Sequence, residues 1–153
     1  GNAFLPTQHQ AVVIGKPGQG TGDGIKNLSN SKYSKSEQRR QFEFLQRLKA
    51  AGIPSCVGSS THRANIDTIM SVLGFEGLFG GIVTAEDVSH GKPDPEVFLK
   101  AAAKTGCAPE NCIVFEDAIA GVEAANKANM TSVGIGDKQT LSEADYNYNN
   151  LII

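Results

Sequence analysis

The sequence lacks the features that mark several large classes of protein. It has no long basic run, and its formal net charge is −2, so neither nucleic acid nor an anionic membrane is expected as a partner. No apolar stretch approaches the length of a membrane span, and the first residues lack the basic-then-apolar pattern of a secretory signal. We therefore expect a cytoplasmic protein.

Cysteine is also scarce. The three cysteines, Cys56, Cys107 and Cys112, are odd in number and do not have the spacing of a metal site. Cys56 and Cys112 lie inside apolar runs, which favours small buried hydrophobic side chains over reactive thiols. This pattern agrees with a reducing compartment.

What remains is an ordinary globular composition of 153 residues, with 40% hydrophobic and 20% charged residues. A chain of this length is expected to form one domain over residues 1–153. Short apolar runs alternate with segments of helical periodicity. The expected strands are 11–14, 56–58, 82–84, 112–115 and 132–135, with a last pairing candidate at 151–153. The expected helices run from a capping box at 34–37 to Gly52, over 66–73, over 96–104, and through an alanine-rich segment to 128.

Short apolar strands separated by amphipathic helices predict an α/β fold: a doubly wound parallel sheet with helices on both faces. Residues 15–36, which are rich in glycine and then in polar residues, are expected to form a loop. Their glycines do not fit the G-x-G-x-x-G fingerprint, because the third glycine would fall on Asp23 or Ile25. They do not fit a P-loop either, because Lys16 precedes the glycines and no helical pattern follows.

Polar residues follow two of the predicted strands or stand in a loop that is expected at the same edge. Ser59 and Ser60 follow one strand, Glu116 and Asp117 end another, and Lys92 lies between Gly91 and a proline. Taken singly, a hydroxyl here is more often a helix cap, the lysine a solvated charge, and the acids partners of a helix dipole. Parallel sheets bind ligands at the carboxyl ends of their strands. The presence of hydroxyls, a lysine and two acids together at this edge therefore predicts a phosphate and metal site.

Four segments, in order, resemble the haloacid dehalogenase (HAD) superfamily, nearest the β-phosphoglucomutase-like phosphatases. They are residues 45–54, 57–63, 91–98 and 115–125. The resemblance implies that Ser59, with Ser60 beside it, binds the phosphoryl group, that Lys92 orients phosphate and nucleophile, and that Asp117 and Glu116 hold Mg²⁺. It further implies a reaction through an aspartyl-phosphate, in which covalent catalysis divides one difficult displacement into two steps.

The chain departs from the family pattern at the first motif, an apolar strand followed by Asp-x-Asp-Gly. The best local match places Gly15 and Pro17 at the two aspartate positions, and neither side chain can attack phosphorus or carry a proton. Asp23-Gly24 is the nearby acid-glycine pair, but no apolar strand precedes it, and Thr21 stands where the nucleophile would be.

The span from Gly15 to Ser59 is 44 positions (59 minus 15), too few for the helical cap domain of this subfamily. We expect a capless core whose open site is weakly selective, and whose apolar rim favours homo-oligomers. Three hypotheses remain open. One is an impaired Mg²⁺-dependent phosphatase or phosphomutase-like domain, and another is a silent relative that binds inorganic phosphate, a small phosphorylated metabolite or a protein partner. The third is an incomplete or rearranged version of a capped enzyme that retains the fold and has lost the function.

Overall fold

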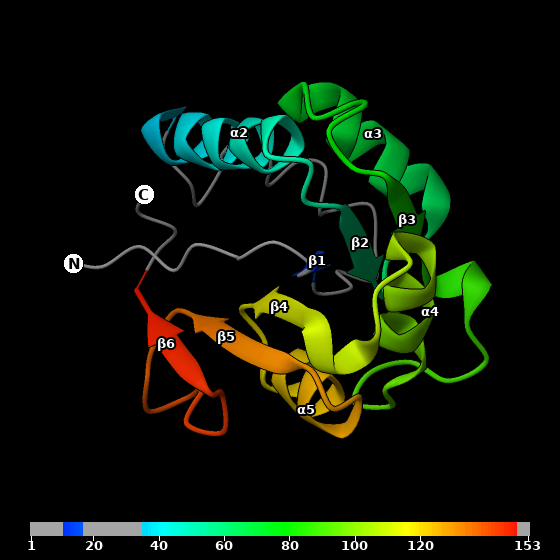
Figure 1. The fold of residues 1–153 in the computed structure, drawn as a ribbon, viewed down its shortest axis with the longest axis vertical. Helices are drawn as coiled ribbons and strands as arrows, with labels where there is room; N and C mark the ends of the chain where they lie inside the picture. The colour runs from blue at the N-terminus through cyan, green and yellow to red at the C-terminus, as the bar shows by residue number, and fades with distance from the viewer. Residues whose placement is uncertain (1–10, 17–34, 150–153) are drawn as a thin grey trace.

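A computed structural model of the chain describes residues 11–16 and 35–149. Figure 1 shows a central sheet with helices on either side. Its strands are β1 (Ala11–Lys16), β2 (Ser55–Ser59), β3 (Gly81–Val83), β4 (Cys112–Glu116), β5 (Thr131–Ile135) and β6 (Tyr146–Tyr148). Its helices are α2 (Lys35–Ala50), α3 (Arg63–Leu73), α4 (Glu96–Thr105) and α5 (Ile119–Lys127), with 3₁₀ turns η1 (Ala85–Asp87) and η2 (Pro109–Asn111).

The six strands of this sheet are all parallel and lie in the order β3-β2-β1-β4-β5-β6. The chain moves outward from β1 to β2 and β3, and then returns to the other side of β1 to build β4, β5 and β6. The strand order therefore reverses between β1 and β4, which is where such sheets bind ligands beyond their carboxyl ends. The predicted doubly wound parallel sheet is confirmed.

Alternate residues of one strand enter different hydrophobic cores. In β4, Cys112 and Val114 pack with α4 and α5, whereas Ile113 and Phe115 pack with α2 and α3. β2 behaves likewise, with Cys56 on the first face and Val57 on the second. Figure 1 shows the two helix pairs on opposite sides of the sheet. A strand buried on both faces has to be apolar at every position, which is why the strands read as continuous apolar runs.

The cysteines lie where the apolar runs predict. Cys56 and Cys112 are fully buried and Cys107 is half-buried, and all three are free thiols. Burial raises the pKa of both the Cys56 and the Cys112 thiol to about 11, so both stay protonated at neutral pH. They are therefore packing residues and not nucleophiles.

The predicted loop over 15–36 is shorter at both ends. β1 continues through Gly15 to Lys16, because both residues pair with β2 in parallel register, and α2 begins at Lys35. The remaining residues 17–34, which include Pro17, Thr21, Asp23 and the proposed capping serine, lie outside the described residues. No cap domain occurs among the residues that the structure describes, where α2 alone lies between β1 and β2.

The last strand was not predicted. β6 has the sequence Tyr-Asn-Tyr, without the apolar run that signals a buried strand, and its pairing with β5 places Tyr146 opposite Val133. Tyr146 is exposed, as edge strands permit, so a burial pattern could not reveal it. The expected pairing segment at 151–153 lies outside the described residues.

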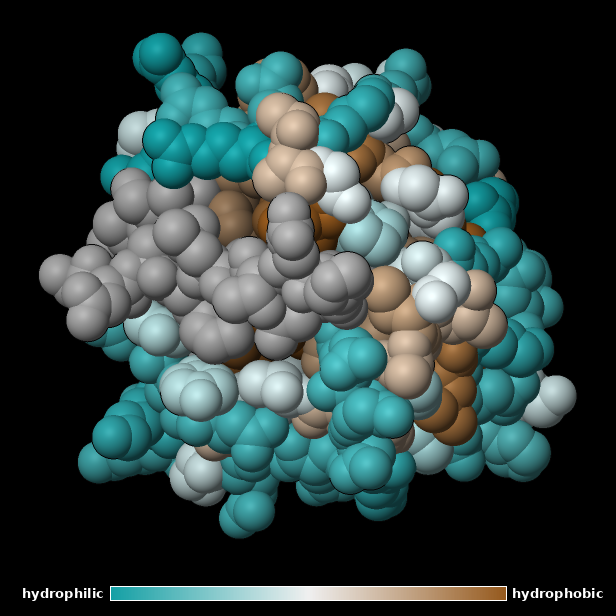
Figure 2. Space-filling view, in the orientation of Figure 1, coloured by the Kyte–Doolittle hydropathy of each residue, from teal (hydrophilic) through white to brown (hydrophobic). Residues whose placement is uncertain are grey.

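The surface of the described part is mainly hydrophilic around its outline, and apolar atoms are visible beside the grey residues in Figure 2. Its large exposed apolar side chains are Val72, Leu99, Ile119 and Tyr146. None of the helices described is both long and apolar enough to pass through a bilayer.

Candidate functional site

The carboxyl ends of β2 and β4 bring the predicted site residues to one edge of the sheet, on either side of β1. Ser59 ends β2 opposite Lys16 of β1, while Glu116 ends β4, one residue past the Phe115–Ile14 pair. Gly15 lies between them in β1 and pairs with Gly58. The position assigned to the family's first aspartate is thus inside the strand that separates Ser59 from Glu116.

Lys92 and Glu116 form a buried ion pair at this edge. The Lys92 Nζ lies 2.9 Å from Glu116 Oε2, and the two side chains are only 5% and 0% exposed. The same ammonium is 4.8 Å from the ring centre of Phe98, within cation–π range. The structure therefore joins two of the predicted site residues directly, from a loop and a strand 24 positions apart.

The other oxygen of Glu116 is also engaged. Glu116 Oε1 accepts hydrogen bonds from the backbone N–H groups of Asp117 and Ala118, at 3.0 and 3.1 Å. Burial raises the pKa of the Glu116 carboxyl above its ordinary value, and the Lys92 ammonium opposes that rise. These contacts account for a charged group in the core, since buried charges require both a counter-ion and hydrogen bonds.

Gly121 makes the position of Glu116 possible. A Cβ atom on Gly121 would lie 2.0 Å from both Cδ and Oε2 of Glu116, far inside van der Waals contact. Helix α5 can approach the carboxylate this closely only with glycine here. Sequence reasoning included this glycine in the family resemblance but gave it no role; the spacing Glu-x₄-Gly was the available signal.

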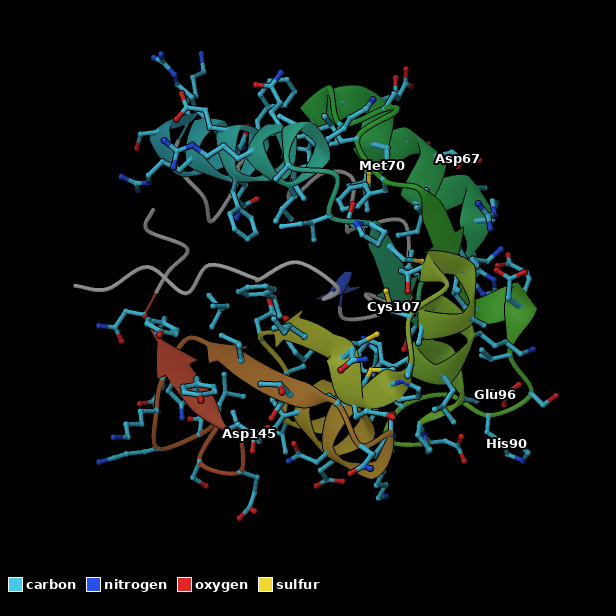
Figure 3. All side chains as sticks on the ribbon, viewed as in Figure 1. Asp67, Met70, His90, Glu96, Cys107 and Asp145 are labelled. Carbon is cyan, nitrogen blue, oxygen red and sulfur yellow. The ribbon has the colours of Figure 1, made fainter. Side chains whose placement is uncertain are left out.

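The loop that carries Lys92 is held by hydrogen bonds on both sides. Before it, Glu96 accepts the backbone N–H groups of Ser89 and His90, each at 3.0 Å to its nearer oxygen, and Figure 3 shows the His90 and Glu96 side chains close together. After it, Asp94 Oδ1 accepts the N–H of Glu96 at 2.9 Å, and the Lys92–Pro93 peptide bond is cis. The Lys92 side chain carried by this loop is only 5% exposed, so the interpretation of Lys92 as a solvated charge is wrong.

Ser59 is fully buried, and its hydroxyl accepts the backbone N–H of Thr61 at 3.1 Å; Ser60 is half-buried beside it. The alternative that one of these hydroxyls caps the following helix is wrong. The N-cap of α3 is His62, which makes no side-chain capping bond. Ser59 and Ser60 stay predicted phosphate-binding residues.

The first turn of α3 is instead capped by a residue from another segment, Glu86 of η1. Both carboxylate oxygens of Glu86 accept the backbone N–H of Arg63, at 3.0 and 3.2 Å, and Oε1 also lies 3.0 Å from His62 Nδ1. Sequence reasoning had assigned no role to His62 and Arg63, and it missed Glu86. No local signal marks this cap, because the helix and the carboxylate are 23 residues apart.

The Glu86 cap predicts a loss of stability in acid. Hydrogen bonds from its own backbone N–H and from the Thr84 hydroxyl lower the pKa of Glu86 from 4.5 to about 2. A carboxylate whose pKa is lowered by folding stabilises the protein above its unfolded pKa, and this stabilisation disappears as pH falls through the folded value. We expect the difference in Tm between wild type and Glu86→Gln to be constant above about pH 5 and to close toward pH 2.

Thermal unfolding followed by circular dichroism between pH 2 and 6 tests this. Glu76→Gln is the matched control, because Glu76 is exposed and makes no hydrogen bond among the described residues; its Tm should run parallel to wild type. A gap for Glu86→Gln that persists unchanged to pH 2 would contradict the prediction.

The oxygen atoms available as metal ligands around Asp117 do not by themselves make a magnesium site. Asp117 is exposed at the edge of the sheet, but both oxygens of Glu116 already accept hydrogen bonds, and Gly15 has no side chain to offer. Across residues 11–16 and 35–149, no three His, Cys, Asp or Glu side chains are grouped to hold a metal ion. Mg²⁺ binding by Asp117 and Glu116 stays a prediction.

The fold and the site together define a class: a doubly wound parallel α/β domain with a buried Lys–Glu pair at the strand switch point. More particularly, the chain belongs to the haloacid dehalogenase-like hydrolases, whose family model matches residues 25–135. The match begins after Gly15, so the assignment of the first motif to Gly15 and Pro17 stays a prediction.

Three similar proteins illustrate the relationship. The chain is 39% identical over 107 residues to validoxylamine A 7′-phosphate phosphatase from Streptomyces hygroscopicus subsp. limoneus, covering 68% of this chain and 50% of that protein. It is 38% identical over 118 residues to the chloroplastic protein SUPPRESSOR OF QUENCHING 1 from Arabidopsis thaliana, covering 74% and 11%. The crystal structure of β-phosphoglucomutase from Clostridium difficile superposes with a TM-score of 0.67 at 34% identity, covering 71% and 48%.

The chain is therefore a phosphatase- or phosphomutase-like domain of this family, and the resemblance to β-phosphoglucomutase-like phosphatases is confirmed. It spans at most about half the length of these relatives: 50%, 11% and 48%.

Proposed function

We propose that this domain binds phosphate or a phosphate monoester at the edge formed by Ser59, Lys92 and Asp117, and that its phosphoryl-transfer activity is impaired. The observation that carries the proposal is the buried Lys92–Glu116 pair, which lies at the strand switch point beside β1. β1 carries Gly15, the residue that the sequence comparison with the family motif predicts at the position of the first aspartate. The pair supports an anion site, and the glycine supports the loss of the nucleophile.

The free energy needed to bury the Lys92–Glu116 pair supports an anion site. A lysine with a 5% exposed side chain and a fully buried glutamate are expensive to keep in a core, and apolar residues of similar volume would often be as stable. Such a pair at a ligand-binding edge is therefore better explained by chemistry than by stability. The ammonium charge suits phosphoryl oxygens, and the substrate class agrees with relatives named as phosphatases.

Impaired turnover follows from the role of the missing acid. An attacking carboxylate, its proton-transfer partner and the lysine act as one unit, so the survivors cannot supply the lost rate. Mg²⁺ enters the proposal as a weakly held ion at Asp117, since Mg²⁺ is commonly bound by one or two carboxylates together with substrate phosphates. A silent phosphate-binding relative is the limiting case of the same proposal.

Hydrolysis of p-nitrophenyl phosphate in MgCl₂ tests the activity. We expect wild type to show no turnover above buffer, and Gly15→Asp combined with Pro17→Asp to raise the rate at least about tenfold by restoring the covalent route. Adding Lys92→Met to that double variant should abolish the gain, and EDTA should do the same. Wild-type turnover that is lost in Lys92→Met would contradict the proposed impairment.

Thermal unfolding with inorganic phosphate tests binding without turnover. A ligand that binds only the folded state adds about 2.7 kcal/mol at a hundredfold excess over Kd. We expect phosphate to raise the Tm of wild type more than chloride at equal ionic strength does. Equal Tm values in the two salts would refute the binding proposal.

A further inference from the structure

We propose that Glu86 is a positioning residue for the phosphate-binding loop Ser59–Arg63, and that it holds this loop from the η1 turn on the neighbouring strand connection. This rests on the proposed function, because it assigns that loop to phosphate. The loop follows β2 and the turn follows β3, so the two segments meet at adjacent carboxyl ends of the sheet.

The Glu86 side chain binds the end of the loop at His62 and Arg63. Its two oxygens accept the same backbone N–H, that of Arg63, at 3.0 and 3.2 Å, and Oε1 is 3.0 Å from His62 Nδ1. The Thr84 hydroxyl lies 2.9 Å from Oε2 and fixes the carboxylate on its own side. One side chain thus connects the loop to the turn through several hydrogen bonds.

A second connection reaches from the same turn to Ser59. The backbone N–H of Ala85 donates to the carbonyl oxygen of Thr61 at 3.1 Å, and the N–H of Thr61 donates to Ser59 Oγ at 3.1 Å. A shift of η1 is therefore transmitted to the buried hydroxyl through two hydrogen bonds. The Glu86 side chain therefore holds the Arg63 end of the loop. The backbone of the adjacent residue Ala85 connects the same turn to Thr61 and Ser59.

The turn is itself rigid enough to act as a support. Asp87 Oδ2 accepts the backbone N–H of Thr84 at 2.8 Å and lies 3.1 Å from the Thr84 hydroxyl, a closed capping box. Arg63 Nη2 donates to the carbonyl oxygen of Ile82 at 3.0 Å and lies 3.3 Å from Asp87 Oδ2. The loop and the turn are therefore joined by side chains from both segments.

The position of Glu86 also decides where a phosphate lies. The first turn of a helix offers unpaired N–H groups and a positive dipole end to an anion. In α3 the Glu86 carboxylate already occupies this place. A phosphate is consequently directed to the other end of the loop, beside Ser59 and Ser60.

When Glu86 is replaced, an effect of its charge and an effect of its positioning role would change phosphate affinity in opposite directions, which makes the proposal testable. Glu86→Gln and Glu86→Ala each remove a negative charge near the anion site, so long-range electrostatics alone would tighten phosphate binding. Positioning predicts weaker binding: about tenfold for the alanine variant, and a smaller loss for glutamine, which keeps one acceptor oxygen for the Arg63 N–H. We would measure phosphate Kd by ¹H–¹⁵N NMR titration at pH 7, well below each variant's Tm.

Glu76→Gln serves as the charge-matched control, because it removes the same charge from an exposed site near the opposite, amino end of β3. Its phosphate Kd should equal that of wild type. A purely structural role for Glu86 would lower Tm and leave Kd unchanged. Equal or tighter binding in both Glu86 variants would overturn the proposal.

A second measurement separates this inference from the proposed function. Amide exchange at Thr61 and Arg63 should be about tenfold faster in Glu86→Ala than in wild type without any phosphate present. If wild type binds no phosphate, the proposed function fails, and unchanged exchange would then refute the loop support independently. Faster exchange with unchanged phosphate Kd would show that Glu86 holds the loop without affecting phosphate binding, and would also overturn the positioning role.

Discussion

Replacing Lys92 with methionine is expected to lower the free energy of unfolding by about 3–5 kcal/mol, the cost of leaving a buried charge without its partner. The reason is geometric: Glu116 is fully buried, and its Oε2 receives the Lys92 ammonium at 2.9 Å. Methionine fills a similar volume but has no charge, so the loss reports the ammonium group, including its 4.8 Å contact with the Phe98 ring. Urea denaturation followed by circular dichroism measures it.

A double-mutant cycle makes this prediction specific. Adding Glu116→Gln to Lys92→Met replaces the ion pair by neutral groups, and we expect the double variant to be more stable than Lys92→Met alone. Arg39→Met is the exposed control: Arg39 pairs with Glu43 at 3.1 Å on the surface of α2, with side chains 81% and 53% exposed. The unfolding free energy of Arg39→Met should stay within about 0.5 kcal/mol of the wild-type value. A similarly small loss for Lys92→Met would contradict the burial argument.

Gly121→Ala is expected to be the second most damaging single change. In an unobstructed helix the change would stabilise by about 1 kcal/mol, because alanine has the better helix propensity. Here the new Cβ would lie 2.0 Å from Glu116 Cδ, and the carboxylate cannot move without breaking its bond to Lys92. Overpacking of this kind typically costs about 1–3 kcal/mol and occasionally more, so we expect a net loss of about 2 kcal/mol.

Alanine substitutions at two further glycines are expected to cause smaller losses of stability than Gly121→Ala. At Gly58 a Cβ would lie 2.9 Å from Phe98 Cδ1, and the ring can shift slightly, so Gly58→Ala should cost less than Gly121→Ala. At Gly91 a Cβ would meet nothing within 4 Å, so Gly91→Ala should leave stability almost unchanged. Thermal unfolding of the three variants gives the order. An unchanged Tm for Gly121→Ala would show that α5 shifts without cost.

The strands flanking β1 could be predicted because their burial on both faces requires apolar residues throughout. Cys56, Val57 and the run over β4 met that requirement and were found without a structure. β6 was missed for the complementary reason, since Tyr146 is exposed at the edge of the sheet and carries no burial pattern. The predicted parallel topology indicated the carboxyl ends of the strands as the ligand-binding side, but the switch point between β1 and β4 was located only by the observed strand order.

The residue types of the candidate site were also readable, but most of their contacts were not. That Lys92 meets Glu116 was expected only as proximity at one edge; the direct ion pair, the burial and the role of Gly121 depend on how α5 packs against β4. The role of Glu86 could not be predicted from the sequence, because its partner Arg63 is 23 residues away and nothing local to either residue indicates the contact.

The sequence by itself determined the class of fold, the family and the edge of the sheet where polar groups gather, because periodicity and short motifs are local properties of the chain. Only the tertiary structure decided which charges are buried together and which carboxylate caps α3. Those outcomes depend on the distances between segments that folding alone brings into contact, and the energy of a charge changes steeply with such distances and with its removal from water.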